Sequence, residues 1–154
     1  MESLTSREYD VLLKEYELLH ARVNDYDSRL FQIKGWSITI FSAMLGFAIL
    51  KDKPLLLIVP FFTCFIFWGL DALYKSFQRI TIERTVEVES FFNGTIDNIK
   101  PARVSLSFED RDTTLLGRIK RVGGALFVFN VMALYIGKLI ILAIVGLALI
   151  NANL

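Results

Sequence analysis

The stretches WSITIFSAMLGFAIL (residues 36–50) and LLLIVPFFTCFIFWGLDALY (residues 55–74) decide the fold of this chain. A helix needs about 20 apolar residues to cross the hydrocarbon core of a bilayer. The second stretch has that length, and the first is short enough to thin the bilayer or lean on a neighbouring helix. A third apolar stretch, ALFVFNVMALYIGKLIILAIVGLALI, covers residues 125–150. The sequence therefore predicts an all-α membrane protein with three transmembrane helices.

The composition favours this interpretation over a soluble one. The chain has 154 residues, of which 54% are hydrophobic and 13 are phenylalanine. In a soluble protein the three stretches would be buried core helices, but too little polar sequence remains to cover them. The net charge of +1 provides no field that would attract a polyanion. We therefore expect the lipid bilayer as a partner, and no nucleic acid.

Lysine and arginine predict the orientation, because they accumulate on the cytosolic side of a membrane. Residues 1–35 carry five of them and residues 75–124 carry nine, whereas residues 51–54 carry two and the last four residues carry none. We expect a multi-pass protein of the cell inner membrane. Its N-terminus and long loop lie in the cytosol, and its C-terminus lies outside.

Residues 1–35 read as a cytosolic amphipathic helix that is continuous with the first span. Apolar residues recur at spacings of three and four, which is the heptad pattern of a packed helix. They are Tyr9, Leu12, Tyr16, Leu19, Val23, Tyr26, Leu30 and Ile33. We expect one helix over residues 6–50. Its apolar face packs either on a helix of the same chain or in a coiled coil between subunits, and we favour the first.

The helix of the second span supplies that partner by continuing into the cytosol. Since the turn at Asp52 and Lys53 is short, the two helices must form an antiparallel hairpin. Two residues that face each other at the same height of this hairpin then have numbers that sum to about 105. This register predicts three opposite-charge matches, which are Lys34 with Asp71, Arg22 with Glu83, and Asp25 and Asp27 with Arg79.

The remainder of residues 75–124 is predicted as a helix extension, a loop and a basic juxtamembrane helix. The extension ends at Asn93-Gly94, and residues 104–108 alternate as a short strand would. That loop is either a connector or a binding loop. Asp112-Thr113-Thr114 offers a helix N-cap. Arg118, Lys120 and Arg121 then face an anionic leaflet, or are simply positive-inside charges.

Four polar residues of the spans are candidates to line a pore: Lys138, Asn130, Ser37 and Ser42. Polar groups in a span are costly against lipid and tend to face protein or water. Asn130 and Lys138 are eight residues apart, which places them on nearly one face. Lys138 either reaches an interface, or faces a water-filled path or a subunit contact.

No motif for chemistry is present. The sequence has no glycine-rich phosphate loop, zinc-ligand spacing, nucleophile elbow or kinase signature. Its only cysteine, Cys64, lies in an apolar run, and its only histidine, His20, lies beside the heptad stripe. We expect no enzyme activity, no catalytic residue, no cofactor and no metal site.

The layout resembles SLATT-type small bacterial membrane effectors over about the first 90 residues. The similar parts are YELLHARVNDYDSRLFQIKGW, the short hairpin of two spans, and the exit FWGLDALYKSFQRITIER. The third span departs from the simple two-span form. This resemblance implies a homo-oligomer that permeabilises the membrane in phage defence, triggered by a cytosolic protein or a nucleotide signal. The alternative is a membrane scaffold or accessory subunit that anchors a cytosolic partner.

Overall fold

The computed structural model describes residues 5–100 and 115–152, and every regular element in that part of the chain is a helix. Three helical segments are long and apolar enough to cross a membrane. The predicted all-α class, with three candidate membrane spans, is therefore confirmed. The elements in chain order are α1 (Ser6–Leu50), the 3-10 helix η1 (Pro54–Leu57), α2 (Ile58–Phe92), α4 (Leu115–Leu126) and α5 (Phe129–Ala152).

Helix α1 starts at a capping box and runs without interruption for 45 residues. The Thr5 side chain accepts a hydrogen bond from the backbone of Glu8, whose carboxylate accepts one from the Thr5 backbone in return. These bonds satisfy donors that a helix start leaves free. At 1.5 Å per residue the helix is about 68 Å long, which is more than twice a hydrocarbon core of about 30 Å. A single helix can therefore cross a membrane and extend well beyond it.

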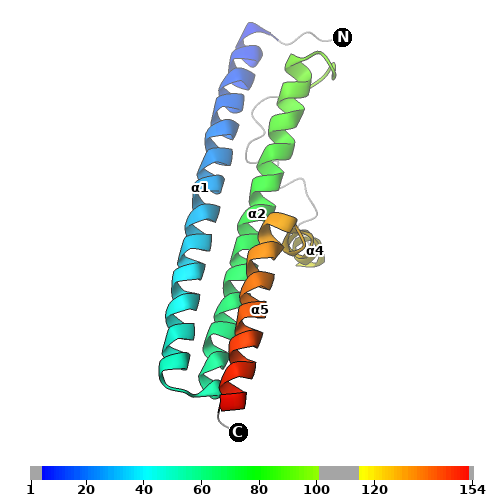
Figure 1. Ribbon diagram of the computed structural model, residues 1–154. Helices are drawn as coiled ribbons and strands as arrows, with labels where there is room; N and C mark the ends of the chain where they lie inside the picture. The colour runs from blue at the N-terminus through cyan, green and yellow to red at the C-terminus, as the bar shows by residue number, and fades with distance from the viewer. Residues whose placement is uncertain (1–4, 101–114, 153–154) are drawn as a thin grey trace.

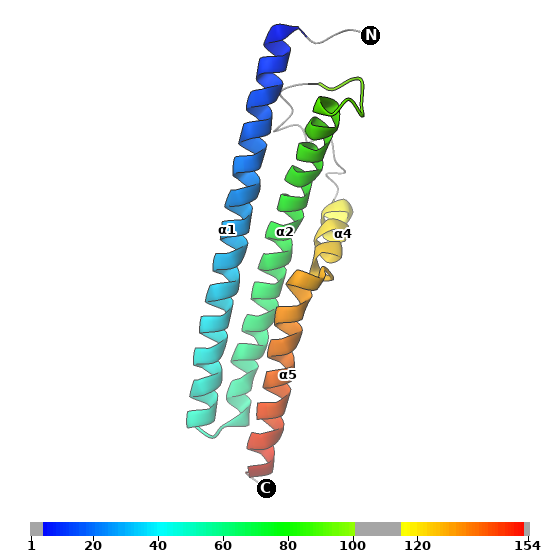
Figure 2. The same cartoon turned by 45° about the horizontal axis from the view of Figure 1, so that its top comes forward.

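A tight turn brings the chain back beside α1. Asp52 has a positive φ of 50°, a conformation that aspartate tolerates better than most residues. Pro54 opens η1, where a missing backbone N–H costs nothing. Helix α2 then lies along α1 in both views, running in the opposite direction (Figures 1 and 2). It ends at Phe92, after which Gly94 takes a φ of 69°.

Two apolar clusters hold the helices together. At the end far from the turn, Leu12 and Leu19 of α1 pack with Val88 and Ile99. Near α5 the buried residues are Cys64, Ala72, Ala125, Val131 and Tyr135. The first cluster lies in the part of α1 where charged residues occupy the positions between the apolar heptad residues. The second joins α4 and α5 to α2.

The third predicted span, residues 125–150, is not one helix. Ala125 and Leu126 end α4, and α5 begins at Phe129 and runs at an angle to α4 (Figure 2). Gly123 and Gly124 precede the break, and glycine is a weak helix former. The indole of Trp68 donates to the carbonyl of Leu126 at 3.2 Å, which satisfies an acceptor exposed at the break. The strand predicted at residues 104–108 and the N-cap at 112–114 lie outside the described residues.

Candidate functional site

All three long helices contribute to one buried polar group, which we call the ion cluster. It consists of Lys34 and Ser37 of α1, Asp71 of α2, and Tyr135 and Lys138 of α5. Four of these residues are at most 5% exposed, and Lys34 is partly exposed. Charged side chains inside apolar spans are rare and usually functional. The cluster is therefore the candidate functional site.

Asp71 is the least satisfied member of the cluster. Its side chain is fully buried, and the Nζ of Lys34 lies 3.9 Å from its Oδ2. That distance makes an ion pair but exceeds a hydrogen bond. Within the described residues, no donor makes a hydrogen bond to either carboxylate oxygen. The Tyr135 hydroxyl donates instead to the carbonyl of Phe67 at 3.1 Å. One long ion pair is thus the main compensation for a buried charge.

Lys138 lies among the helices of its own chain, between α5 and α1. Its ammonium donates to Ser37 Oγ and lies 5.0 Å from the Tyr135 ring centroid and 5.7 Å from that of Phe41. Aromatic faces attract a desolvated cation. In this conformation Lys138 and Ser37 face the neighbouring helices rather than the surroundings. Their burial is the feature that the sequence alone did not predict.

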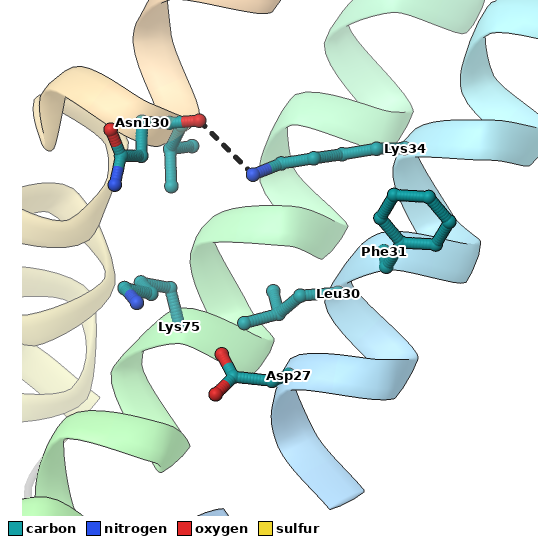
Figure 3. A pocket seen from close by; sticks show the side chains of 7 residues that line it. Asp27, Leu30, Phe31, Lys34, Lys75 and Asn130 are labelled. Atoms are coloured by element: carbon teal, nitrogen blue, oxygen red, sulfur yellow. Dashed lines mark hydrogen bonds between the residues drawn. The ribbon is translucent and has the colours of Figure 1, made fainter. Parts of the chain in front are cut away.

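The other two pore candidates are placed differently. The Asn130 and Ser42 side chains are exposed. Eight residues of helix rotate a side chain by about 80°, so Asn130 and Lys138 lie on different faces of α5. The Asn130 backbone carbonyl nevertheless accepts a hydrogen bond from Lys34 at 3.1 Å, as Figure 3 shows. Lys34 thus links the start of α5 to Asp71.

Several contacts between α1 and α2 follow the predicted register. Lys34 meets Asp71, and two further contacts also have residue numbers that sum to 105, namely Asp27 with Gln78 at 2.6 Å and Tyr16 with Glu89 at 3.0 Å. The predicted partner of Asp25 and Asp27 was Arg79. Asp25 pairs instead with Arg29, one turn along α1, at 2.8 Å. Arg79, Arg22 and Glu83 are all exposed.

A second buried ion pair was missed by the sequence analysis. Arg84 Nε donates to Glu15 at 2.9 Å, and both side chains are nearly fully buried. Arg84 also binds Glu87 at 2.9 Å and the Lys100 carbonyl at 2.8 Å. Burial alone would lower the pKa of Arg84, but its hydrogen bonds to Glu15 and Glu87 outweigh burial and raise the pKa.

A signal for this pair was present in the sequence. Arg84 stands four residues from both Ile80 and Val88, so it falls on the apolar stripe of α2. Glu15 stands in the same way between Leu12 and Leu19 of α1. A charge on each of two facing apolar stripes must find a partner. The register did not point to this pair, because the numbers of its two residues sum to 99.

The basic residues of α4 differ in exposure. The Lys120 side chain is exposed. Arg121 is half-buried, and its Nε donates to the Gly117 carbonyl at 3.4 Å. The side chain of Arg118 lies outside the described part of the structure. The prediction that all three contact an anionic leaflet stays a prediction.

No protein family, curated protein or solved structure matches this chain. Function must therefore be argued from the site itself. Within residues 5–100 and 115–152, no group of three or more His, Cys, Asp or Glu residues could hold a metal ion. The described site brings two lysines and one aspartate together between three long helices, with Asp71 and Lys138 buried and Lys34 partly exposed.

Proposed function

We propose that this chain is a self-associating protein of the inner membrane that permeabilises the membrane when a cytosolic trigger acts. In this proposal the N-terminus, the far ends of the antiparallel α1–α2 hairpin, and α4 lie in the cytosol. The C-terminus lies outside. The trigger is a cytosolic protein or a nucleotide signal, and the setting is phage defence. The resemblance of the first 90 residues to SLATT-type effectors supports this proposal.

The observation that carries the proposal is the poorly satisfied carboxylate of Asp71. A buried ion costs several kcal/mol unless good hydrogen bonds compensate it. Asp71 has only the 3.9 Å contact with Lys34 as an ion pair, and Lys138 adds a second buried ammonium nearby. A state in which water reaches these groups would recover their hydration energy. We therefore expect a second, hydrated arrangement of the helices, which a trigger can populate in place of the packed one.

An open state must involve several copies of the chain. Three spans are too few helices to surround a wide aqueous path. Closed rings of identical subunits are the usual solution for a small protein. In such a ring, Lys34, Asp71 and Lys138 would turn from the protomer interior toward the shared path.

The experiment compares Lys138→Leu with Lys53→Leu in cells that carry a potential-sensitive dye. Lys138→Leu replaces the buried ammonium with an apolar side chain and favours the packed state. We expect depolarisation on induction to fall by about tenfold or more, which corresponds to about 1.4 kcal/mol between the two states. Lys53 is exposed in the turn. Its substitution removes the same charge outside the cluster and should change nothing.

Two controls make the result decisive. Protein level and elution volume in detergent must match the wild type for both variants. A wild-type protein that is monomeric in detergent and never changes the membrane potential would contradict the proposal.

A membrane scaffold is the second candidate function. Several apolar side chains of the predicted cytosolic hairpin are exposed, including Leu13 at 45%, Leu18 at 51% and Val86 at 52%. Exposed apolar residues of this kind can bind a protein partner. An oligomer that leaves the membrane potential unchanged, with or without Lys138, would favour this function over permeabilisation.

A further inference from the structure

A small pocket opens between α1, α2 and the start of α5. Its volume is about 180 Å³, and its charged and polar lining residues are Asp27, Lys34, Lys75 and Asn130. Figure 3 shows these four side chains around the pocket, with the two lysines and Asn130 to one side of Asp27. Leu30 and Val131 complete the wall, and Phe31, which is 80% exposed, lies at the edge.

The charges around the pocket are arranged by hydrogen bonds. Lys75 Nζ donates to Gln78 Oε1 at 2.6 Å, and Gln78 Nε2 donates to Asp27 Oδ1 at 2.6 Å. The Gln78 side chain therefore bridges the Lys75 ammonium and the Asp27 carboxylate. The Lys34 ammonium donates to the Asn130 carbonyl and lies 3.9 Å from Asp71. Two lysines are thus balanced by two carboxylates.

The pocket lies where a membrane interface is expected. The apolar run of α1 begins at Trp36, two residues after Lys34, and that of α2 ends at Tyr74, one residue before Lys75. Tryptophan and tyrosine concentrate at the headgroup level of membrane proteins. The exposed ring of Phe31 gives the edge of the pocket an apolar surface beside the charges.

We propose that this pocket binds the headgroup of a phospholipid that carries a primary ammonium, as phosphatidylethanolamine does. The phosphate binds Lys34, Lys75 and the Asn130 amide. The ammonium of the same headgroup donates hydrogen bonds to Asp27. The glycerol and acyl chains leave the pocket past Phe31 and stay in the bilayer. The proposal requires that the helices cross a membrane, but it does not require that the protein opens a pore.

Size and charge distinguish this ligand from others. Whole small-molecule ligands usually occupy pockets of about 300 to 1,000 Å³, so this pocket suits a headgroup better than a nucleotide. An anionic lipid without an ammonium would bring net negative charge next to Asp27. A choline headgroup has no N–H to donate to the carboxylate. A headgroup with both charges leaves unchanged the balance between the two lysines and the carboxylates of Asp27 and Asp71.

The experiment is a lipid titration of delipidated full-length protein in detergent, followed by native mass spectrometry. Phosphatidylethanolamine, phosphatidylglycerol and phosphatidylcholine with identical chains are compared, together with soluble phosphoethanolamine and inorganic phosphate. We expect the ethanolamine lipid to bind most tightly. The two soluble compounds should not bind at the lipid concentrations used, because the acyl chains hold the headgroup at the interface.

Matched variants test the two halves of the site. Lys75→Gln should weaken binding of the ethanolamine lipid about fivefold, the size expected for one partly exposed charged contact. The control Arg79→Gln, one turn along α2, should not. Asp27→Asn should abolish the preference for the ethanolamine lipid over phosphatidylglycerol, whereas the control Asp25→Asn should keep that preference. Neither control residue lines the pocket.

Several results would overturn the proposal. Equal or tighter binding of phosphatidylglycerol or phosphatidylcholine to the wild type would do so without any variant. Binding of soluble phosphoethanolamine or phosphate as tight as that of the lipid would replace the lipid by a free ligand. Equal effects of Lys75→Gln and Arg79→Gln would locate the lipid elsewhere. If Lys75→Gln or Asp27→Asn does not fold, the wild-type preference among the three lipids still decides.

Discussion

The Asp71 carboxylate is buried at a position where no donor of the described residues makes a hydrogen bond to it. Its ion pair with Lys34 spans 3.9 Å, and the two side chains differ in exposure, with 29% for Lys34 and 0% for Asp71. Solvent can therefore reach the Lys34 ammonium more readily than the Asp71 carboxylate. Removing Lys34 leaves the Asp71 carboxylate buried without its ion-pair partner.

A charge exchange tests this pair. Asp71→Lys should destabilise the protein by several kcal/mol, because it places a second ammonium beside Lys34 in a buried site. Adding Lys34→Asp should restore part of the loss. Recovery is incomplete because an aspartate at position 34 cannot donate to the Asn130 carbonyl. The measurement is the fraction of protein that stays monodisperse in detergent after heating. A double variant no better than Asp71→Lys would show that the two residues are not coupled.

At the scale of elements, α1 and α2 are joined beyond the apolar stretches by Glu15 and Arg84. Arg84 also binds the Lys100 carbonyl, so one side chain connects two helices and the chain that follows α2. Leu12, Leu19 and Val88, which stand three or four residues from Glu15 or Arg84, form an apolar cluster in the same part of the two helices. The far end of the hairpin therefore depends on a charge pair as well as on its heptad contacts.

Substitutions of this pair should separate charge burial from packing. Glu15→Gln should destabilise the hairpin by about 3 to 5 kcal/mol, because it leaves the Arg84 guanidinium buried with weaker compensation. Glu15→Leu combined with Arg84→Met should cost much less, since both buried charges are removed together. Thermal unfolding followed by circular dichroism in detergent gives the comparison. A double variant that unfolds earlier than Glu15→Gln would contradict this account.

The contact of Tyr16 with Glu89 predicts a pH effect on the same two helices. The hydrogen bond to Glu89 raises the pKa of Tyr16, with smaller contributions from burial and from the charge of Glu89. The bond thus stabilises the fold below the ordinary tyrosine pKa of about 10. That stabilisation is lost as the pH rises through the raised pKa of Tyr16.

Unfolding measured from neutral to strongly alkaline pH should show this loss. Tyr16→Phe should be less stable than the wild type near neutral pH, and the difference should shrink at high pH. Tyr9→Phe is the control, because Tyr9 contacts the Phe92 ring instead of a carboxylate. His20 Nε2 lies 3.6 Å from the same oxygen of Glu89. A substitution of Glu89 would therefore alter two contacts, whereas Tyr16→Phe removes only the hydrogen bond from the phenol. A constant difference across the range would mean that the bond does not depend on the phenol proton.

For the whole molecule, the distribution of lysine and arginine predicts how the three spans are oriented. Cysteine labelling tests this after Cys64→Ala removes the native thiol. Single cysteines at positions 2 and 105 should react only from the cytosolic side, and one at position 154 only from outside. Labelling of the cysteine at position 154 from the cytosolic side would contradict the arrangement of three spans with an outside C-terminus.

The helical class and the candidate spans could be read from the sequence, because apolar runs of this length leave few alternatives to a membrane helix. The heptad over residues 6–33 and the short turn at Asp52 also predict that Lys34 and Asp71 lie level. Both inferences depend on periodicity and chain length, which are local properties. Level position alone does not decide which way a long side chain turns, and Asp25 and Asp27 contact Arg29 and Gln78.

Only the tertiary structure decided the place of Lys138, the Glu15–Arg84 pair and the break between Leu126 and Phe129. Ser37 and Lys138 are 101 residues apart, and their contact depends on the depth and rotation of α5 against α1. The near-uniform hydrophobicity of α5 does not specify that rotation, so a sequence alone leaves every face equally open to lipid or protein. Packing selects one face of α5, because the buried Lys138 ammonium needs the Ser37 oxygen and the aromatic rings that contact it there.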